Sequence, residues 1–267
     1  MRIRYVDRGN GEPVVLVHSY AGDLEDQWVT TGVLPELARS HRVIAFDVRG
    51  HGKSGKPHDP EAYGPEMAWD VVRLLDHLGI ANAHVIGYSM GAHIVAQLLT
   101  LAPHRFITAT LGGGSGRRNW KAEDDLQAKV EADEMERGLL NAQTMRLLPA
   151  DQPQPTALQV EEMSANFLAG KDTLALAAIR RSNKAQVVTP DQMTAAQVPV
   201  LGIVGSADPY LPGFHDLKSA MPKLELVVLD GATHFSAPSK PEFVRAILSF
   251  LRIHAVQVQP RSECGLS

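Results

Sequence analysis

The chain has 267 residues, 44% of them hydrophobic and 21% charged, a composition typical of a globular domain with one sizeable core. A net charge of −4 and the lack of a basic block argue against a nucleic-acid partner. No apolar run approaches the roughly 18 residues of a membrane span, and the N-terminus lacks the apolar stretch of a signal peptide, so we expect a cytoplasmic protein.

Short apolar runs recur along the chain, and each is closed by glycine or a polar residue. The first six residues alternate like a strand. Runs of β-branched and aliphatic residues then predict buried parallel strands at 14–18, 42–47, 84–88, 107–111, 199–204 and 224–229.

Helical patterns lie between these runs. Apolar residues recur at spacings of three and four in 66–78 and in 241–251, which is typical of an amphipathic helix. The segment 90–101 is apolar nearly all round, as expected of a buried helix, and Pro103 lies just beyond it. Strands that alternate with helices predict an α/β fold, with a mostly parallel, doubly wound sheet covered on both faces.

The alternation stops between residues 116 and 197. This segment is mostly helical, and its middle is marked as a loop by Pro149, Pro153 and Pro155. We interpret 116–197 as a helical cap inserted into an α/β core formed by 1–115 and 198–255. Residues 256–267 remain as a C-terminal tail, in which the lone Cys264 can form no internal disulfide.

The segment Gly87-Tyr88-Ser89-Met90-Gly91 joins an expected strand to an apolar helix. A serine on such a sharp turn adopts a strained backbone, and only small residues fit two positions to either side. Its hydroxyl is exposed at a helix N-terminus, where the helix dipole and free N–H groups favour developing negative charge. We therefore predict that Ser89 is a nucleophile.

A serine hydroxyl needs a base, usually a histidine oriented by a carboxylate, in the chain order serine, acid, histidine. Of the eleven histidines, His234 directly follows the last expected strand, whereas His215 precedes that strand and His254 lies in the final helix or tail. Asp208 follows the strand at 199–204, where the sites of open α/β sheets gather. These positions predict His234 as the base and Asp208 as the acid.

Two other aspartates are rivals for the acid. Asp216 lies deeper in the next helical segment, and Asp230 is only four residues before His234. The oxyanion of acyl transfer needs two N–H donors. We assign them to the backbone of Met90, after the nucleophile, and of Tyr20, in the loop after the first buried strand.

On these residues the chain resembles the α/β-hydrolase family, in its serine-nucleophile, esterase-like branch, over residues 14–251. The segment Asp47-Val48-Arg49-Gly50-His51-Gly52-Lys53-Ser54 is also similar to a family loop. The resemblance implies a structural role for that loop, so neither Asp47 nor His51 is nominated as catalytic. The chain departs from the family at Ser19, where glycine is common. Members that act on alkyl halides or epoxides use an aspartate nucleophile, whereas this chain has Ser89.

The predicted function is hydrolysis of a small carboxylic ester through an acyl-enzyme, with no cofactor. No clustered metal-ligand motif such as His-Glu-x-x-His is present, so we expect no metal. A lactonase, a thioesterase, a hydrolase of carbon–carbon bonds and a perhydrolase would use the same residues, and a non-catalytic small-molecule receptor could retain them. The sequence assigns neither the substrate-binding residues nor the oligomeric state.

The cap is expected to lay part of its apolar residues over Ser89 and form a mostly apolar pocket. The candidates are Trp120, Met135, Leu139, Leu140, Met145, Leu147, Leu148, Phe167 and Leu168. The adjacent pairs Arg117-Arg118 and Arg180-Arg181 are predicted to be solvated rather than convergent. We therefore expect neutral short-chain esters to be preferred over anionic ones.

Overall fold

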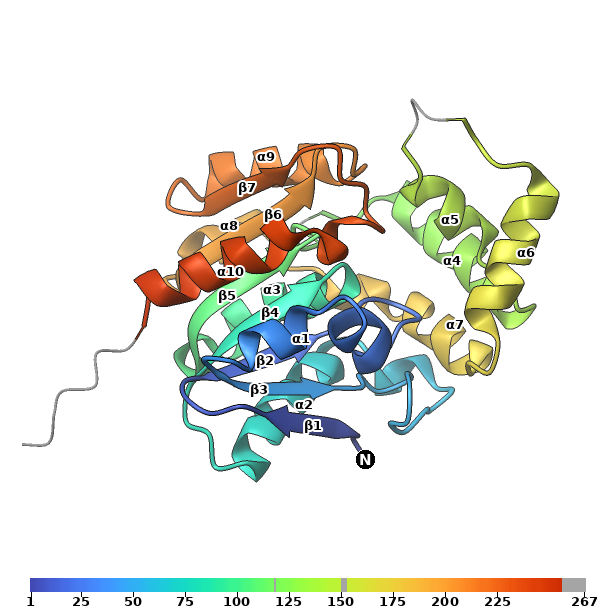
Figure 1. Cartoon of the computed structure of the whole chain (residues 1–267). Helices are drawn as coiled ribbons and strands as arrows, with labels where there is room; N and C mark the ends of the chain where they lie inside the picture. The colour runs from blue at the N-terminus through green and yellow to red at the C-terminus, as the bar shows by residue number, and fades with distance from the viewer. Residues whose placement is uncertain (118, 150–152, 256–267) are drawn as a thin grey trace, which may run out of the picture.

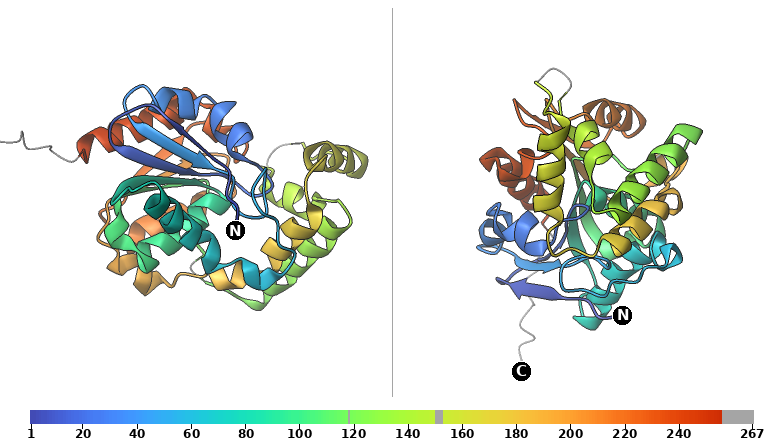
Figure 2. Two further views of the ribbon diagram at one scale, coloured as in Figure 1. Left: turned by 90° about the horizontal axis from the view of Figure 1, so that it is seen from below. Right: turned by 90° about the vertical axis from the view of Figure 1, so that its right-hand side faces the viewer.

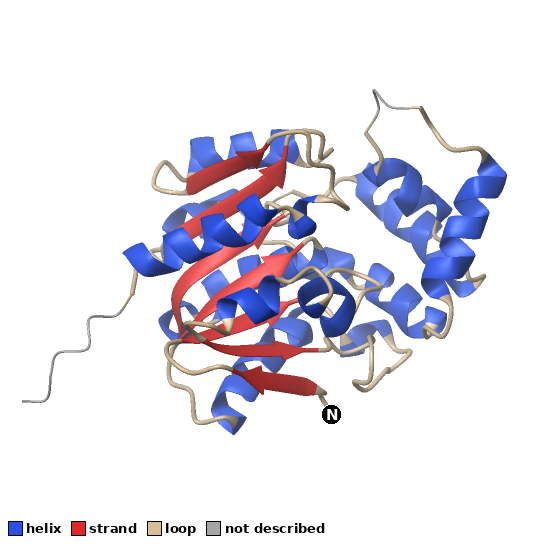
Figure 3. Ribbon diagram, viewed as in Figure 1, coloured by secondary structure: helices blue, strands red, loops and turns tan. Residues whose placement is uncertain are grey.

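The computed structural model of the chain describes residues 1–117, 119–149 and 153–255. Its centre is a seven-stranded sheet in the order β1-β3-β2-β4-β5-β6-β7 (Figures 1 and 3). The strands are β1 (Tyr5–Arg8), β2 (Pro13–Val17), β3 (Arg42–Phe46), β4 (Ala83–Tyr88), β5 (Phe106–Gly112), β6 (Val200–Gly205) and β7 (Glu225–Leu229). Only β1 pairs antiparallel within this sheet, and all the other pairings are parallel. The predicted α/β class with a mostly parallel sheet is confirmed.

Helices cover both faces of the sheet. One face carries α2 (Pro65–His77), α3 (Met90–Leu101), α8 (Pro190–Ala195) and α9 (Leu211–Ala220). The other carries α1 (Val33–Leu37) and α10 (Pro241–Ile253). Because both faces are covered, the central strands β4 and β6 are buried along their whole length, which explains their nearly continuous apolar sequences.

The segment between β5 and β6 is helical, as expected. It contains α4 (Ala122–Glu136), α5 (Asn141–Leu147), α6 (Ala157–Leu168) and α7 (Thr173–Arg181), followed by α8. Helices α4 to α7 extend beyond the carboxyl ends of the parallel strands, whereas α8 packs beside α3 and α9 on the sheet (Figures 1 and 2). We call α4 to α7 the helical insertion; the division of the chain into core and cap at 116 and 197 stays a prediction.

Short helical turns complete the described secondary structure, at Glu25–Val29, Pro60–Ala62, Pro103–Arg105, Asn183–Gln186 and Ala237–Ser239. None of the described helices has the length and apolar character needed to cross a bilayer. The expected tail at 256–267, with Cys264, and Arg118 lie outside the described residues.

Candidate active site

Ser89 stands between the end of β4 and the start of α3, with a backbone φ of 53°. This left-handed conformation is costly for a residue with a side chain, and it raises the serine above the carboxyl edge of the sheet. The glycines on either side have a steric cause. A Cβ on Gly87 would collide with the carbonyl of Gly91, and a Cβ on Gly91 would collide with the carbonyl of Val17 in β2.

We expect the substitution Gly91→Ala to lower the free energy of unfolding by about 3 kcal/mol, the upper part of the usual range for overpacking. The added methyl meets a backbone carbonyl of β2, which cannot rotate away as a side chain could. Urea denaturation measures the change. Gly22→Ala is the control, because its Cβ would meet only Ser19, the hydroxyl at 3.2 Å and the backbone carbonyl at 3.5 Å, which is an ordinary contact distance; equal stability of the two variants would contradict the steric argument.

The structure brings Ser89, His234 and Asp208 into one hydrogen-bonded chain. The distance from Ser89 Oγ to His234 Nε2 is 3.0 Å, and that from His234 Nδ1 to Asp208 Oδ2 is 2.9 Å. An ionised carboxylate can only accept, so Nδ1 carries the imidazole proton and Nε2 is free to accept from the serine hydroxyl. Both His234 and Asp208 are buried.

The three residues of this hydrogen-bonded chain each follow the carboxyl end of a different parallel strand. Ser89 follows β4. Asp208 follows β6, and His234 follows β7, which lies beside β6 in parallel register. The rival acids Asp216 and Asp230 are both exposed. Asp208 Oδ1 additionally accepts from the backbone N–H of Tyr210 at 2.9 Å, so both oxygens of the carboxylate are held.

The loop after β2 lies beside Ser89 because Val17 is opposite Gly87 in the pairing of β2 with β4. Met90 is the first residue of α3, and its N–H therefore has no acceptor inside the helix. For Tyr20, too, the described part of the chain contains no backbone acceptor of the N–H. Both groups are thus available as donors, and their role at an oxyanion stays a prediction.

Side chains of the core hold the loop that carries Tyr20. His18 Nε2 accepts from the N–H of Val48 at 2.9 Å, and burial lowers the pKa of His18, which keeps the ring neutral. Ser19, where the family commonly has glycine, does not have a positive φ, so glycine is not required there; Ala21, two residues later, has a φ of 57°.

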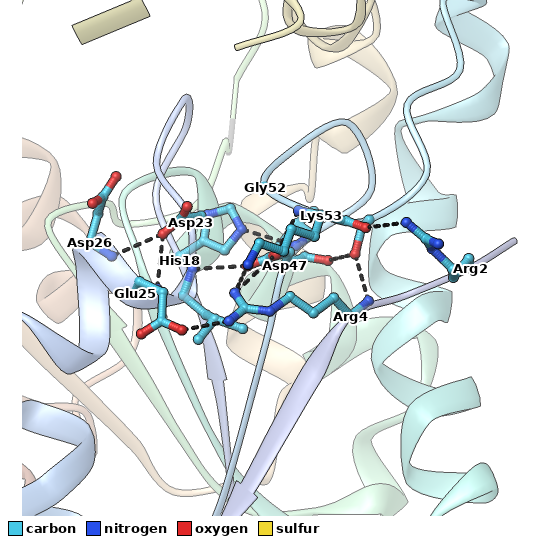
Figure 4. Close-up of polar contacts among 12 residues, drawn as sticks. Arg2, Arg4, His18, Asp23, Glu25, Asp26, Asp47, Gly52 and Lys53 are labelled. Atoms are coloured by element: carbon cyan, nitrogen blue, oxygen red, sulfur yellow. Dashed lines mark hydrogen bonds and ion pairs between the residues drawn. The ribbon is translucent and has the colours of Figure 1, made fainter. Parts of the chain in front are cut away.

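Asp47, directly after β3, joins this loop to two other segments (Figure 4). The buried carboxylate accepts from the N–H of Leu24 at 3.1 Å and of Lys53 at 2.8 Å, and Arg4 lies 3.3 Å from it. A buried charge with these partners is satisfied and has no free oxygen for chemistry. The contacts are those of a structural residue, as the resemblance implied for Asp47.

A cavity of about 790 Å³ opens over Ser89 and His234, within the size range of small-molecule sites. Its lining includes Leu140, Leu147, Leu148 and Phe167, as the sequence suggested for part of the insertion, and also Met163, Phe235 and Gln143. Met135 and Leu168 are instead buried in the core. Asp26 is the only Asp, Glu, Lys or Arg among the described residues that line the cavity, so its walls suit a neutral ligand.

Two tyrosines that pack on His234 are absent from the sequence-based assignment. The hydroxyl of Tyr88 donates to the carbonyl of His234 at 2.5 Å, and the rings of Tyr88 and Tyr210 each lie 5.5 Å from the imidazole. Tyr88 directly precedes Ser89, and Tyr210 lies two residues after Asp208. Closeness in sequence to Ser89 and Asp208 was the only sign that these tyrosines could contact His234. It does not show which way a side chain points.

The prediction that the arginine pairs are solvated is wrong for Arg117 and Arg180. Arg180 is buried against Glu131, and Arg117 is half-buried beside it, because α4 and α7 pack closely and enclose both. Arg181 is exposed, as predicted. In the described ranges, no group of three or more His, Cys, Asp or Glu side chains is placed to hold a metal ion.

The sequence and the structure of this chain match those of known proteins. The sequence model of the alpha/beta hydrolase fold matches residues 12–241. The chain belongs to the α/β-hydrolase family. It is 34% identical, over 260 residues, to the dihydrolipoyllysine-residue acetyltransferase component of the acetoin cleaving system of Pseudomonas putida, a match that covers 94% of this chain and 67% of that protein. The chain therefore spans about two thirds of the length of this relative.

Other α/β hydrolases match over nearly their whole length. Esterase YbfF of Escherichia coli is 29% identical over 259 residues, which cover 91% of this chain and 94% of the esterase. The structure of a thermophilic esterase from Thermogutta terrifontis superposes with a TM-score of 0.80 at 24% identity, covering 95% of this chain and 94% of that one. Esterases are thus among its neighbours in sequence and in fold.

Proposed function

We propose that this α/β hydrolase is a carboxylic ester hydrolase that uses Ser89 as nucleophile, His234 as general base and Asp208 as the acid. The single observation that carries the proposal is the hydrogen-bonded chain from Ser89 Oγ through His234 to Asp208, at 3.0 and 2.9 Å. Ser89 and His234 both line the 790 Å³ cavity, so a bound ester could reach the hydroxyl.

In the proposed reaction, His234 Nε2 takes the proton of Ser89 while Oγ attacks the ester carbonyl. Asp208 stabilises the imidazolium, and the N–H groups of Met90 and Tyr20 bind the oxyanion. His234 then protonates the leaving alcohol, which leaves an acyl group on Ser89. A water molecule, deprotonated by His234, releases the acid and restores the hydroxyl.

The acyl group is proposed to lie against the apolar side chains of the insertion, Leu140, Leu147, Met163 and Phe167. Methionine adapts to varied shapes, which favours tolerance of several short or medium chains. A carboxylate in these walls would lose its water and meet no cationic side chain among the described lining residues.

We therefore expect kcat/KM for 4-nitrophenyl pentanoate to exceed that for the 4-nitrophenyl monoester of succinate by at least about tenfold, equivalent to about 1.4 kcal/mol of differential binding. Multi-turnover release of nitrophenol measures both rates, and the same panel with a lactone and a thioester separates those activities from esterase. A preference for the anionic ester would contradict the neutral-ester proposal. A single turnover without acid release would favour a receptor.

A second candidate is transfer of the acyl group to a thiol instead of water. The observation that favours it is the 34% identity, over 94% of this chain, to a protein named as a dihydrolipoyllysine-residue acetyltransferase component. In this reaction a thiolate attacks the acyl-enzyme and forms a thioester. Adding dihydrolipoamide to the ester assay decides between the acceptors: thioester formed at the expense of free acid supports transferase activity, and unchanged acid release supports hydrolase activity.

A further inference from the structure

A second, smaller hollow of about 40 Å³ lies beside helices α4, α5 and α7 of the helical insertion, and its lining differs from that of the large cavity. Two arginines that line it share one buried glutamate. Arg146 Nε lies 2.9 Å from one carboxylate oxygen of Glu131, and Arg180 Nε lies 3.1 Å from the other. Burial alone would raise the pKa of Glu131, but the charges of Arg180 and Arg146 outweigh it and keep that pKa below its ordinary value. Glu131 is therefore ionised and fully used by these two cations.

A third arginine, Arg117, lines the same hollow and has no such partner. Within the described residues the side chain of Arg117 forms no ion pair, and its one hydrogen bond runs from Nε to Gln186 Oε1 at 3.2 Å; the backbone carbonyl accepts from the N–H of Val188. Burial and the nearby charges of Arg180 and Arg146 lower the pKa of Arg117 to about 10, although Glu131 and Tyr210 act in the opposite direction. Arg117 is thus still a cation at neutral pH.

The charges around the hollow do not balance. Besides Glu131, one more carboxylate lines it, that of Asp124, whose Oδ2 accepts from the N–H of Lys121 at 2.7 Å. Three guanidinium groups therefore face two carboxylates. The positive field reaches α3, where burial and then the charges of the three arginines hold the pKa of His93 far below its ordinary value.

We propose that this hollow binds one small carboxylate anion, held by Arg117 together with Arg146 and Arg180. A guanidinium group presents paired N–H donors that match the two oxygens of a carboxylate. A hollow of about 40 Å³ has room for only a few water molecules at most, so it limits the anion to the size of formate or acetate. A monoanion brings the charges of the hollow to balance, and the exposed side chain of Gln127 marks a side open to solvent.

The site is linked by hydrogen bonds to Asp208 and to the wall of the large cavity, but it lies outside that cavity. Arg146 donates to the hydroxyl of Tyr210. The backbone N–H of the same tyrosine donates to Asp208 Oδ1. Arg180 donates to Gln143, which lines the large cavity. An anion on the three arginines therefore lies one side chain away from both the acid and the cavity wall. The proposal does not depend on which substrate the cavity takes.

The test is thermal unfolding of the full chain in a zwitterionic buffer, titrated with sodium acetate. We expect a saturable rise in Tm of about 2–6 °C, whereas neutral acetamide and equal concentrations of sodium chloride should have little effect. The rise should vanish in Arg117→Met, which removes the surplus cation but keeps an apolar chain of similar length. Arg181→Met is the matched control, because Arg181 is the neighbouring exposed arginine, paired with Asp133 and Glu136 outside the hollow.

Without acetate, Arg117→Met should be at least as stable as the wild type, because the substitution removes a half-buried charge that has no acidic partner. An acetate-dependent rise that persists in Arg117→Met, or that is lost equally in Arg181→Met, would overturn the site. If Arg117→Met does not fold, Arg117→Lys decides: we expect a tenfold weaker acetate affinity by calorimetry, and unchanged affinity or failure of this variant to fold would reject the proposal. Ester turnover enters none of these measurements, so the proposed function stands or falls separately.

Discussion

Replacing Ser89 with alanine should lower kcat for a neutral short-chain ester by about 10⁶, the loss typical of removing a triad nucleophile. The fold should persist, because serine already has a Cβ at this backbone φ of 53°, and alanine keeps it. The substitution removes only the hydroxyl that donates to His234. Burst-phase and steady-state release of nitrophenol measure the loss, and circular dichroism checks the fold.

Ser219→Ala is a suitable control, since Ser219 is exposed on α9 and its hydroxyl bonds only the carbonyl of His215 within the described residues. It should retain wild-type turnover. If Ser89→Ala kept even a tenth of the wild-type rate, Ser89 would not be the nucleophile, and the proposed acyl-enzyme mechanism would be wrong.

The substitution Asp208→Asn should lower kcat on the order of 10⁴, the loss known for the same change in a Ser-His-Asp triad. The structure supplies the reason. The N–H of Tyr210 binds Asp208 Oδ1 and will retain the amide oxygen, so the amide NH₂ will face His234 Nδ1. That nitrogen must then accept, the proton moves to Nε2, and the imidazole can no longer take the proton of Ser89.

Asp230→Asn and Asp216→Asn are the matched controls, because both aspartates are exposed and were the rival acids. Both should keep near wild-type kcat. A damaging Asp230→Asn together with a mild Asp208→Asn would show that the acid has been misassigned. A fall in KM without a fall in kcat for Asp208→Asn would also contradict a role in proton transfer.

The sequence alone determined the parallel strands and the positions of the candidate site residues, whereas the first strand lies at Tyr5–Arg8, later than the alternation in the first six residues indicated. Buried parallel strands have short apolar runs. The ends of the six runs in the sequence lie within about one residue of the ends of β2 to β7. In a parallel sheet all carboxyl strand ends lie on one edge, so the order of Ser89, Asp208 and His234 after their strands was enough to predict their convergence. The glycines of the turn added a local steric signal, since backbone carbonyls occupy the space of their missing Cβ atoms.

Only the tertiary structure shows which polar side chains of the helical insertion meet. Glu131, Arg146 and Arg180 come from three helices, and Arg117 from the segment before them, so their meeting depends on how the helices pack rather than on any spacing in the chain. Helix α4 is rich in charged residues and has no clear apolar stripe, so its sequence does not show that Glu131 is the carboxylate turned inward. The contact of Tyr20 with Leu176 spans 156 residues. Long-range contacts of polar side chains leave no periodic pattern, because each depends on one pair of atoms rather than on a repeating face.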